Sequence, residues 1–131
     1  KKLGAKITVC GPKTLIPQNI DQLGVKVVNY LPDAIKGADV LNILRIQNER
    51  QKYGLLPSLR EYSKEFGITK EKLAKFAKKD VLVMHPGPIN RGIEMTSNVA
   101  DGQYSVILNQ VTNGLAVRMA VFYLIAQVGE N

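Results

Sequence analysis

The sequence predicts an α/β fold in which a parallel sheet is flanked by helices on both faces. Short strands alternate with helical stretches along the chain, and most of these strands are apolar on both faces, as in sheets covered from both sides. The chain has 131 residues, of which 45% are hydrophobic, and this suits one globular domain over residues 1–131.

The first part of the chain is expected to contain three strands with a helical segment between each strand and the next. Residues 6–10 form a β-branched run that Gly11 and Pro12 close, so we expect a strand that ends in a loop. Apolar residues then repeat at helical spacing over 16–23, with Gly24 just beyond the end of that helix. The next expected elements are a strand at 25–28, a short helix at 32–38 and an apolar strand at 40–44.

The middle of the chain supplies two more helices and a fourth strand. Ser58 followed by Glu61 is typical of a capping box, which predicts a helix near 58–65. A second helix is expected over 70–78 and a strand over 81–84. This strand must end at His85, because two prolines follow within three residues.

The last part of the chain predicts long helices. From Tyr104 onward, apolar residues recur on two helical faces, which indicates a helix buried on two sides. Asn113-Gly114 is expected to bend or break it, because glycine costs ~1 kcal/mol inside a helix. The apolar stretch 115–128 falls short of the ~20 residues that span a bilayer, so we expect no membrane anchor.

The charge balance narrows the possible partners. Eighteen Lys and Arg against eleven Asp and Glu give a net charge of +7, compatible with nucleic acid, an anionic metabolite or a solvated basic surface. The lysines are scattered, and no aromatic set is interleaved with them to stack bases, so nucleic acid is disfavoured.

The single cysteine and the start of the chain suggest the setting. Cys10 lies in an apolar run, where we expect a small buried side chain in a reducing, cytoplasmic protein. The chain begins at Lys1 without an initiator Met or a secretory leader, so we expect it to be the middle of a longer protein.

Two loops at strand ends carry the candidate chemistry. Arg45 follows an apolar strand, and Gln47 points the same way if the extended backbone continues. An Arg fork with a neighbouring amide can bind a carboxylate, although Arg45 could also be an ordinary loop cation paired with Glu49. In the loop 85–94, prolines fix backbone carbonyls that could accept hydrogen bonds from an amide or amine, or simply form a rigid turn.

His85 is the only histidine, and we expect a structural hydrogen-bonding role because no acid lies at a recognisable partner spacing. Arg91 and Glu94, in the same loop, are expected to form a local ion pair. The sequence contains no cluster with metal-ligand spacing, no glycine-rich phosphate loop and no Ser-His-Asp set. We therefore expect no metal and no cofactor.

Three motifs in order resemble the aspartate carbamoyltransferase catalytic chain: residues 44–50, 84–94 and 110–120. The resemblance covers essentially the whole chain, but only the C-terminal, aspartate-binding domain of a longer catalytic chain. It implies a Rossmann-like second domain of the carbamoyltransferase fold and the transfer of a carbamoyl group from carbamoyl phosphate to L-aspartate in pyrimidine biosynthesis.

The resemblance also implies roles for particular residues. Arg45 and Gln47 would bind L-aspartate, and the backbone of Gly87 and Pro88 would contact carbamoyl phosphate. Residues 50–72 would form a mobile segment that closes over the substrates. Catalysis would rest on positioning and on electrostatic stabilisation of a tetrahedral intermediate.

The family's phosphate-binding motif, catalytic histidine, mobile lysine and a further aspartate-binding arginine have no counterpart in this sequence, and the first strand of the domain's own sheet is expected to be missing. The resemblance therefore places no catalytic residue here, and the chain alone is expected to bind aspartate weakly and to be nearly inactive. The implied partners are an N-terminal carbamoyl-phosphate domain, two further copies in a homotrimer, and dihydroorotase or regulatory chains.

Two alternatives remain at this point. Ornithine carbamoyltransferases resemble this fold, but their corresponding loop has a His-Cys-Leu-Pro pattern in place of residues 85–88. A non-catalytic, carbamoyltransferase-like assembly module is the second alternative, and the presence of both Arg45 and Gln47 weighs against it.

Overall fold

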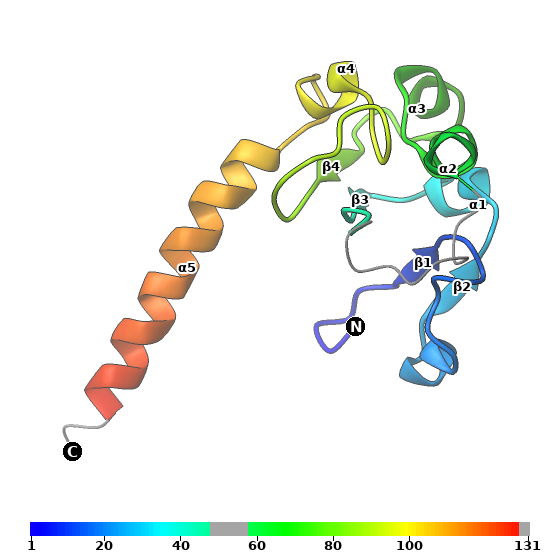
Figure 1. The fold of residues 1–131 in the computed structure, drawn as a ribbon. Helices are drawn as coiled ribbons and strands as arrows, with labels where there is room; N and C mark the ends of the chain where they lie inside the picture. The colour runs from blue at the N-terminus through cyan, green and yellow to red at the C-terminus, as the bar shows by residue number, and fades with distance from the viewer. Residues whose placement is uncertain (48–57, 129–131) are drawn as a thin grey trace.

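The structure is a computed structural model that describes residues 1–47 and 58–128 (Figure 1). Strands and helices alternate along it, as the sequence predicts for an α/β chain. In order they are β1 (Thr8–Cys10), the 3-10 helix η1 (Ile20–Leu23), β2 (Lys26–Val28), α1 (Leu31–Ile35), β3 (Val40–Asn42), α2 (Leu59–Phe66), α3 (Lys70–Phe76), β4 (Leu82–Met84), α4 (Ser97–Ala100) and α5 (Ile107–Val128).

The strands of the described residues pair in parallel, which confirms the predicted sheet type. They form two two-stranded sheets, one of β1 with β2 and one of β3 with β4. Leu41 lies opposite Val83 in the second sheet. On its other side Val83 donates to the carbonyl of Tyr104 (2.7 Å) and accepts from the amide of Val106 (3.0 Å), so β4 is the inner strand.

Local signals set several helix ends as the sequence predicts. The Ser58 hydroxyl accepts a hydrogen bond from the amide of Glu61 at 3.1 Å, so this residue caps α2. The helix expected over 16–23 is wrong in its first half, since only residues 20–23 are helical, as η1. Asn19 adopts a left-handed conformation with φ 61°, which a right-handed helix cannot pass through.

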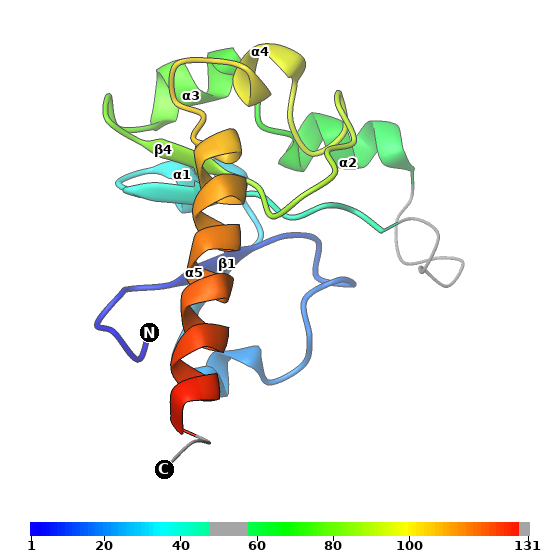
Figure 2. The same cartoon turned by 90° about the vertical axis from the view of Figure 1, so that its left-hand side faces the viewer.

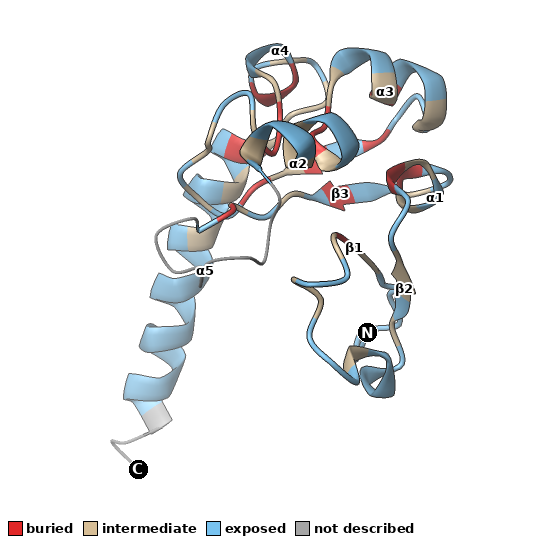
Figure 3. Cartoon of the chain, turned by 45° about the vertical axis from the view of Figure 1, so that its right-hand side comes forward, coloured by how far each residue is buried: buried red, intermediate tan, exposed pale blue. Residues whose placement is uncertain are grey.

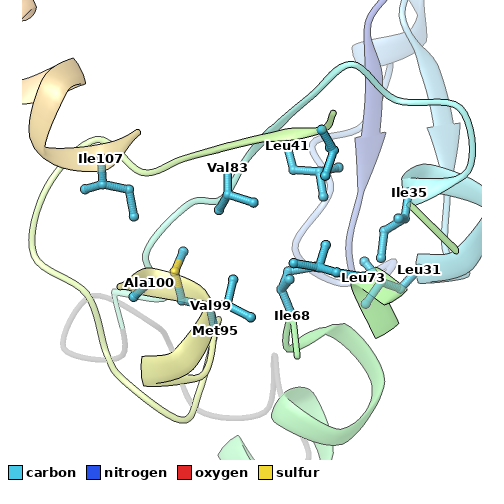
Figure 4. Close-up of a cluster of buried hydrophobic side chains, with 11 residues drawn as sticks. Leu31, Ile35, Leu41, Ile68, Leu73, Val83, Met95, Val99, Ala100 and Ile107 are labelled. Atoms are coloured by element: carbon cyan, nitrogen blue, oxygen red, sulfur yellow. The ribbon is translucent and has the colours of Figure 1, made fainter. Parts of the chain in front are cut away.

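The hydrophobic core lies between the β3–β4 sheet and the helices α1, α3 and α4 (Figure 4). Val83 is fully buried at its centre, and Ile68 and Met95 are each 1% exposed. Ile68 lies between α2 and α3, where its amide donates to the carbonyl of Glu94 at 2.9 Å. The loop of residues 85–94 is called the proline loop below. The segment that follows it, which begins at Met95, therefore packs directly against the helices.

Helix α5 differs from the expectation in two respects. It runs unbroken from Ile107 to Val128, so the break predicted at Asn113-Gly114 is wrong. Burial on two sides is also wrong, since Phe122 is 71% exposed and Ile125 64% exposed. Figures 1 and 2 show α5 leaving the body of the chain beside β4, and Figure 3 shows solvent exposure along most of its length. Of the α5 side chains whose burial is described, Ile107 at the start of the helix belongs to the core.

Among the described residues, the helices are too short or too polar to cross a membrane.

Two isoleucine substitutions distinguish the core from α5. Ile68→Ala is expected to lower the free energy of unfolding by about 2–5 kcal/mol, because it leaves a cavity among buried side chains. Ile125→Ala removes the same atoms from an exposed position, so a change within about 0.5 kcal/mol is expected. Urea unfolding of both variants measures the difference; equal losses would contradict this assignment of the core.

Candidate functional site

The two loops with candidate chemistry leave the same end of the β3–β4 sheet. Asn42 pairs with Met84 in parallel register, and the amide of Ile43 donates to the carbonyl of Met84 at 2.9 Å. Arg45 and Gly87 each lie three positions beyond that last register pair. Ligands of open parallel sheets bind beyond the carboxyl ends of the strands, so this edge is the candidate site.

The segment after β3 contains one buried side chain, that of Ile46. Ile46 is 7% exposed, while Arg45 is half-buried and Gln47 is exposed. Leu44, two positions before Ile46, is 63% exposed, so burial does not alternate along the segment and the expectation that Arg45 and Gln47 share one side stays a prediction. Glu49, the alternative partner of Arg45, lies outside the described residues, as do residues 50–57 of the expected mobile segment.

His85 fixes the start of the proline loop. Its side chain is fully buried, and its ring Nδ1 lies 2.9 Å from the carbonyl oxygen and 3.2 Å from the amide nitrogen of Gly87. Its own amide donates to the Gln110 side-chain oxygen at 3.0 Å, which ties the loop to α5. These contacts give His85 a hydrogen-bonding role that holds Gly87 in place.

Glu94 faces the interior beside His85. The carboxylate is fully buried, with Oε1 3.5 Å from the His85 Nε2, and it accepts a hydrogen bond from the amide of Asn90 at 2.5 Å. The side-chain amide of Asn90 in turn donates to the carbonyl of Ile46 at 3.0 Å. Asn90 thus joins the proline loop to the segment that contains Arg45 and Gln47.

The ion pair expected between Arg91 and Glu94 is wrong. Arg91 instead binds the Asp101 carboxylate with two hydrogen bonds of 2.5 and 2.9 Å on the surface. Gly92, which lies between the expected partners, has φ 83° and reverses the chain, so Arg91 turns outward and Glu94 inward. The Arg91 hydrogen bond holds the pKa of Asp101 below its usual value.

Sequence reasoning missed Asn90, Glu94 and Gln110 as parts of this site. Asn90 and Glu94 stand in the second motif and Gln110 opens the third, but nothing in their spacing indicates which of them turn inward. The hydrogen bonds from Asn90 to Ile46 and from His85 to Gln110 span 44 and 25 positions, so only the fold brings these partners together.

Two further side chains near this region have altered acidity. Burial, followed by the negative charge of Glu94 and a contribution from Cys10, raises the pKa of Tyr62 from 10.0 to about 12. Burial also raises the pKa of the Cys10 thiol, and Asp33 adds to the shift. The half-buried Cys10 therefore stays a neutral thiol, in agreement with the structural role expected for it.

The arrangement places a guanidinium and an amide on one loop and a proline-flanked backbone turn on the next. The first pair suits a carboxylate, and the turn offers backbone groups to a neighbouring polar ligand.

Comparisons with known proteins agree on one family. Residues 1–125 match the family model for the Asp/Orn binding domain of aspartate/ornithine carbamoyltransferase. The chain is 57% identical over 126 residues to the aspartate carbamoyltransferase catalytic subunit of Gemmatimonas aurantiaca, and 58% identical over 127 residues to that of Syntrophobacter fumaroxidans. The matches cover 96% and 97% of this chain but only 39% and 41% of those relatives.

Solved structures of carbamoyltransferases share the fold. The ornithine carbamoyltransferase of Pyrococcus furiosus superposes with a TM-score of 0.72 and 30% identity, covering 92% of this chain and 42% of its own. The aspartate transcarbamoylase of Trypanosoma cruzi, solved with carbamoyl aspartate and phosphate, gives a TM-score of 0.68 at 24% identity, covering 88% and 38%. At that identity the second likeness concerns the fold alone.

The altered acidity of Tyr62 predicts a pH effect. The raised pKa means that the folded state resists ionisation of Tyr62, so stability is retained below pH 10.0 and falls as pH rises toward about 12. Absorbance titration of the phenolates is expected to show one late step, which Tyr62→Phe abolishes. Retention of that step in the variant would show that another tyrosine is responsible.

Proposed function

This chain belongs to the aspartate/ornithine carbamoyltransferase family, and we propose that it forms the aspartate-binding half of an aspartate carbamoyltransferase. The amine of L-aspartate attacks the carbamoyl carbon of carbamoyl phosphate, and loss of a proton and of phosphate gives N-carbamoyl-L-aspartate. The observation that carries the proposal is the parallel register of β3 and β4. Because of this register, Arg45 and Gly87 follow neighbouring strands at the same edge of the sheet.

In the proposed site, Arg45 and Gln47 bind L-aspartate. The planar guanidinium forms two parallel hydrogen bonds to a carboxylate, and the Gln47 amide donates or accepts beside it. Backbone groups of Gly87 and Pro88 face the carbamoyl group, held in place through His85. The net charge of +7 favours two anionic substrates.

Aspartate is a better second substrate for this site than ornithine. Ornithine presents an ammonium where aspartate presents its second carboxylate, and an Arg beside a Gln suits the anion. The proline-flanked turn at 85–88 also differs from the His-Cys-Leu-Pro pattern of the ornithine enzymes. The relatives at 57% and 58% identity are named aspartate carbamoyltransferase catalytic subunits.

The proposed contribution of this chain to catalysis is positioning. Holding the amine of aspartate close to the carbamoyl carbon converts a bimolecular reaction into an effectively unimolecular one. The groups that grip phosphate and stabilise the tetrahedral intermediate belong, in this proposal, to a carbamoyl-phosphate domain, so the chain alone binds aspartate weakly and turns over little.

The exposed side chains of α5 support such a companion domain. Leu115, Phe122 and Ile125 are each more than half exposed and lie on one long helix that projects from the body. A contiguous apolar surface of this kind marks an interaction site in a stable protein. The chain spans about 40% of the length of the relatives it matches, which leaves ample chain for a domain that covers α5.

The wider setting follows from the same proposal. A homotrimer of complete catalytic chains, alone or with dihydroorotase or regulatory chains, would act in cytoplasmic pyrimidine biosynthesis. The single cysteine, Cys10, has no disulfide partner within the chain, which suits a reducing compartment.

Binding of a bisubstrate mimic that joins a phosphonate to aspartate tests the proposed site. Calorimetric titration of the chain reconstituted with a carbamoyl-phosphate domain is expected to give tight binding, and Arg45→Ala is expected to weaken it about 10- to 100-fold because a bidentate ion pair is lost. Lys36→Ala, which removes one exposed positive charge away from the site, is expected to bind like the parent.

The same titration separates the alternatives. A mimic that carries ornithine in place of aspartate is expected to bind poorly, and tighter binding of that mimic would assign the chain to ornithine. A folded, reconstituted sample that binds neither mimic would instead support a non-catalytic assembly module.

The companion-domain proposal has its own test on α5. Phe122→Glu places a charge within the apolar surface and is expected to weaken association with the carbamoyl-phosphate domain at least tenfold, because burying an unpaired carboxylate is costly. Gln127→Glu adds the same charge at an exposed polar position on the same helix and serves as the matched control. Analytical ultracentrifugation of the mixed domains measures both; equal effects would count against a specific surface.

A further inference from the structure

We infer that Asn90 is a positioning residue that couples the two substrate subsites, holding the aspartate-binding segment in register with the carbamoyl-phosphate loop. This inference rests on the function proposed above and adds a residue that contacts neither substrate. The Asn90 side-chain amide donates to the carbonyl of Ile46 at 3.0 Å across 44 positions of sequence.

The acceptor of this hydrogen bond, the Ile46 carbonyl, lies between the two residues proposed to bind aspartate. The Ile46 carbonyl belongs to the peptide unit that joins Ile46 to Gln47, and Arg45 precedes it directly. A hydrogen bond to that carbonyl fixes the plane of the peptide and therefore the direction in which both polar side chains leave the backbone. The buried side chain of Ile46 anchors the opposite side of the segment.

Asn90 is itself held rigidly. Its backbone amide donates to the buried Glu94 carboxylate at 2.5 Å, and the same carboxylate oxygen lies 3.5 Å from the His85 ring nitrogen Nε2. His85 contacts Gly87 at the substrate turn and, through its amide, Gln110 of α5. A series of contacts therefore connects Ile46 to Gly87 through Asn90, Glu94 and His85. Its longest step is the 3.5 Å approach of the Glu94 carboxylate to the His85 Nε2, which is an electrostatic contact and not a hydrogen bond.

The sheet itself does not supply this alignment. Within the described residues, the last backbone hydrogen bond between the two strands joins the amide of Ile43 to Met84. Beyond it both segments leave the strands as loops, and the loop after β3 contains Arg45 and Gln47. The side-chain amide of Asn90 joins the two loops beyond this point, through its hydrogen bond to the Ile46 carbonyl.

This geometry predicts an asymmetric kinetic effect. Without the side-chain amide of Asn90, the Ile46 carbonyl loses the hydrogen bond that joins segment 45–47 to residue 90, whereas Gly87 is still held by His85. The KM for aspartate is therefore expected to rise while the KM for carbamoyl phosphate stays close to that of the parent. A side chain that served stability alone would not separate the two substrates.

Steady-state kinetics of the full-length catalytic chain tests the inference with Asn90→Ala and Asn90→Asp. The second variant keeps the size of the side chain but presents a carboxylate to the Ile46 carbonyl, so it loses the donor. We expect the KM for aspartate to rise about 3- to 10-fold in Asn90→Ala, the loss typical of one hydrogen bond, and at least as much in Asn90→Asp.

Asn29→Ala is the matched control. The Asn29 side-chain amide also donates to a loop carbonyl, that of Gly11, at 2.8 Å, but it joins the residue after β2 to the loop after β1. This variant is expected to lose similar thermal stability while both KM values stay unchanged. Thermal unfolding of all variants identifies any that fails to fold, and isothermal titration with the bisubstrate mimic then reports on Asn90→Asp.

The outcomes separate the inference from the proposed function. Parent enzyme that does not carbamoylate aspartate overturns the proposed function itself. Active parent enzyme whose Asn90 variants keep the aspartate KM, or raise both KM values equally, overturns only the coupling role of Asn90. A rise confined to aspartate in the Asn90 variants and absent from Asn29→Ala supports it.

Discussion

The parallel register of β3 and β4 is the constraint on which the rest of the site depends. Because the two strands run in the same direction and pair residue for residue, their carboxyl ends finish at one edge, and the chain must leave that edge twice. Val83, fully buried between Leu41 and the bridge at Ser105, holds this alignment in the core. A shift of register by one residue would turn the polar side chains of either loop to the opposite face.

Beyond the strands, buried polar groups continue the alignment. A carboxylate such as Glu94, removed from water, is costly unless it is paired and hydrogen-bonded. His85 and the amide of Asn90 meet part of this requirement, so the loop has a strong preference for the conformation that brings them together. Loop residues that bind substrate gain rigidity from polar contacts that themselves touch no ligand.

Helix α5 and the site loops are linked through Gln110, which accepts from the amide of His85. The first turn of α5 therefore supports the proline loop, while the rest of the helix exposes Phe122 and Ile125. A domain that packs on α5, as the proposed function requires, would contact the same helix that holds the substrate turn.

Local sequence determined much of this protein. The alternation of apolar strands and helices gave the α/β class, and the side chain of Ser58 set the start of α2, because these signals act over a few neighbouring residues. The strand-end position of Arg45 followed from the same periodicity. Tertiary structure decided the rest: Gly92 turned Glu94 inward and Arg91 outward, and α5 continued through Gly114 with its apolar side chains exposed. These outcomes depend on which surfaces meet across the fold, a relation between distant residues that spacing along the chain does not encode.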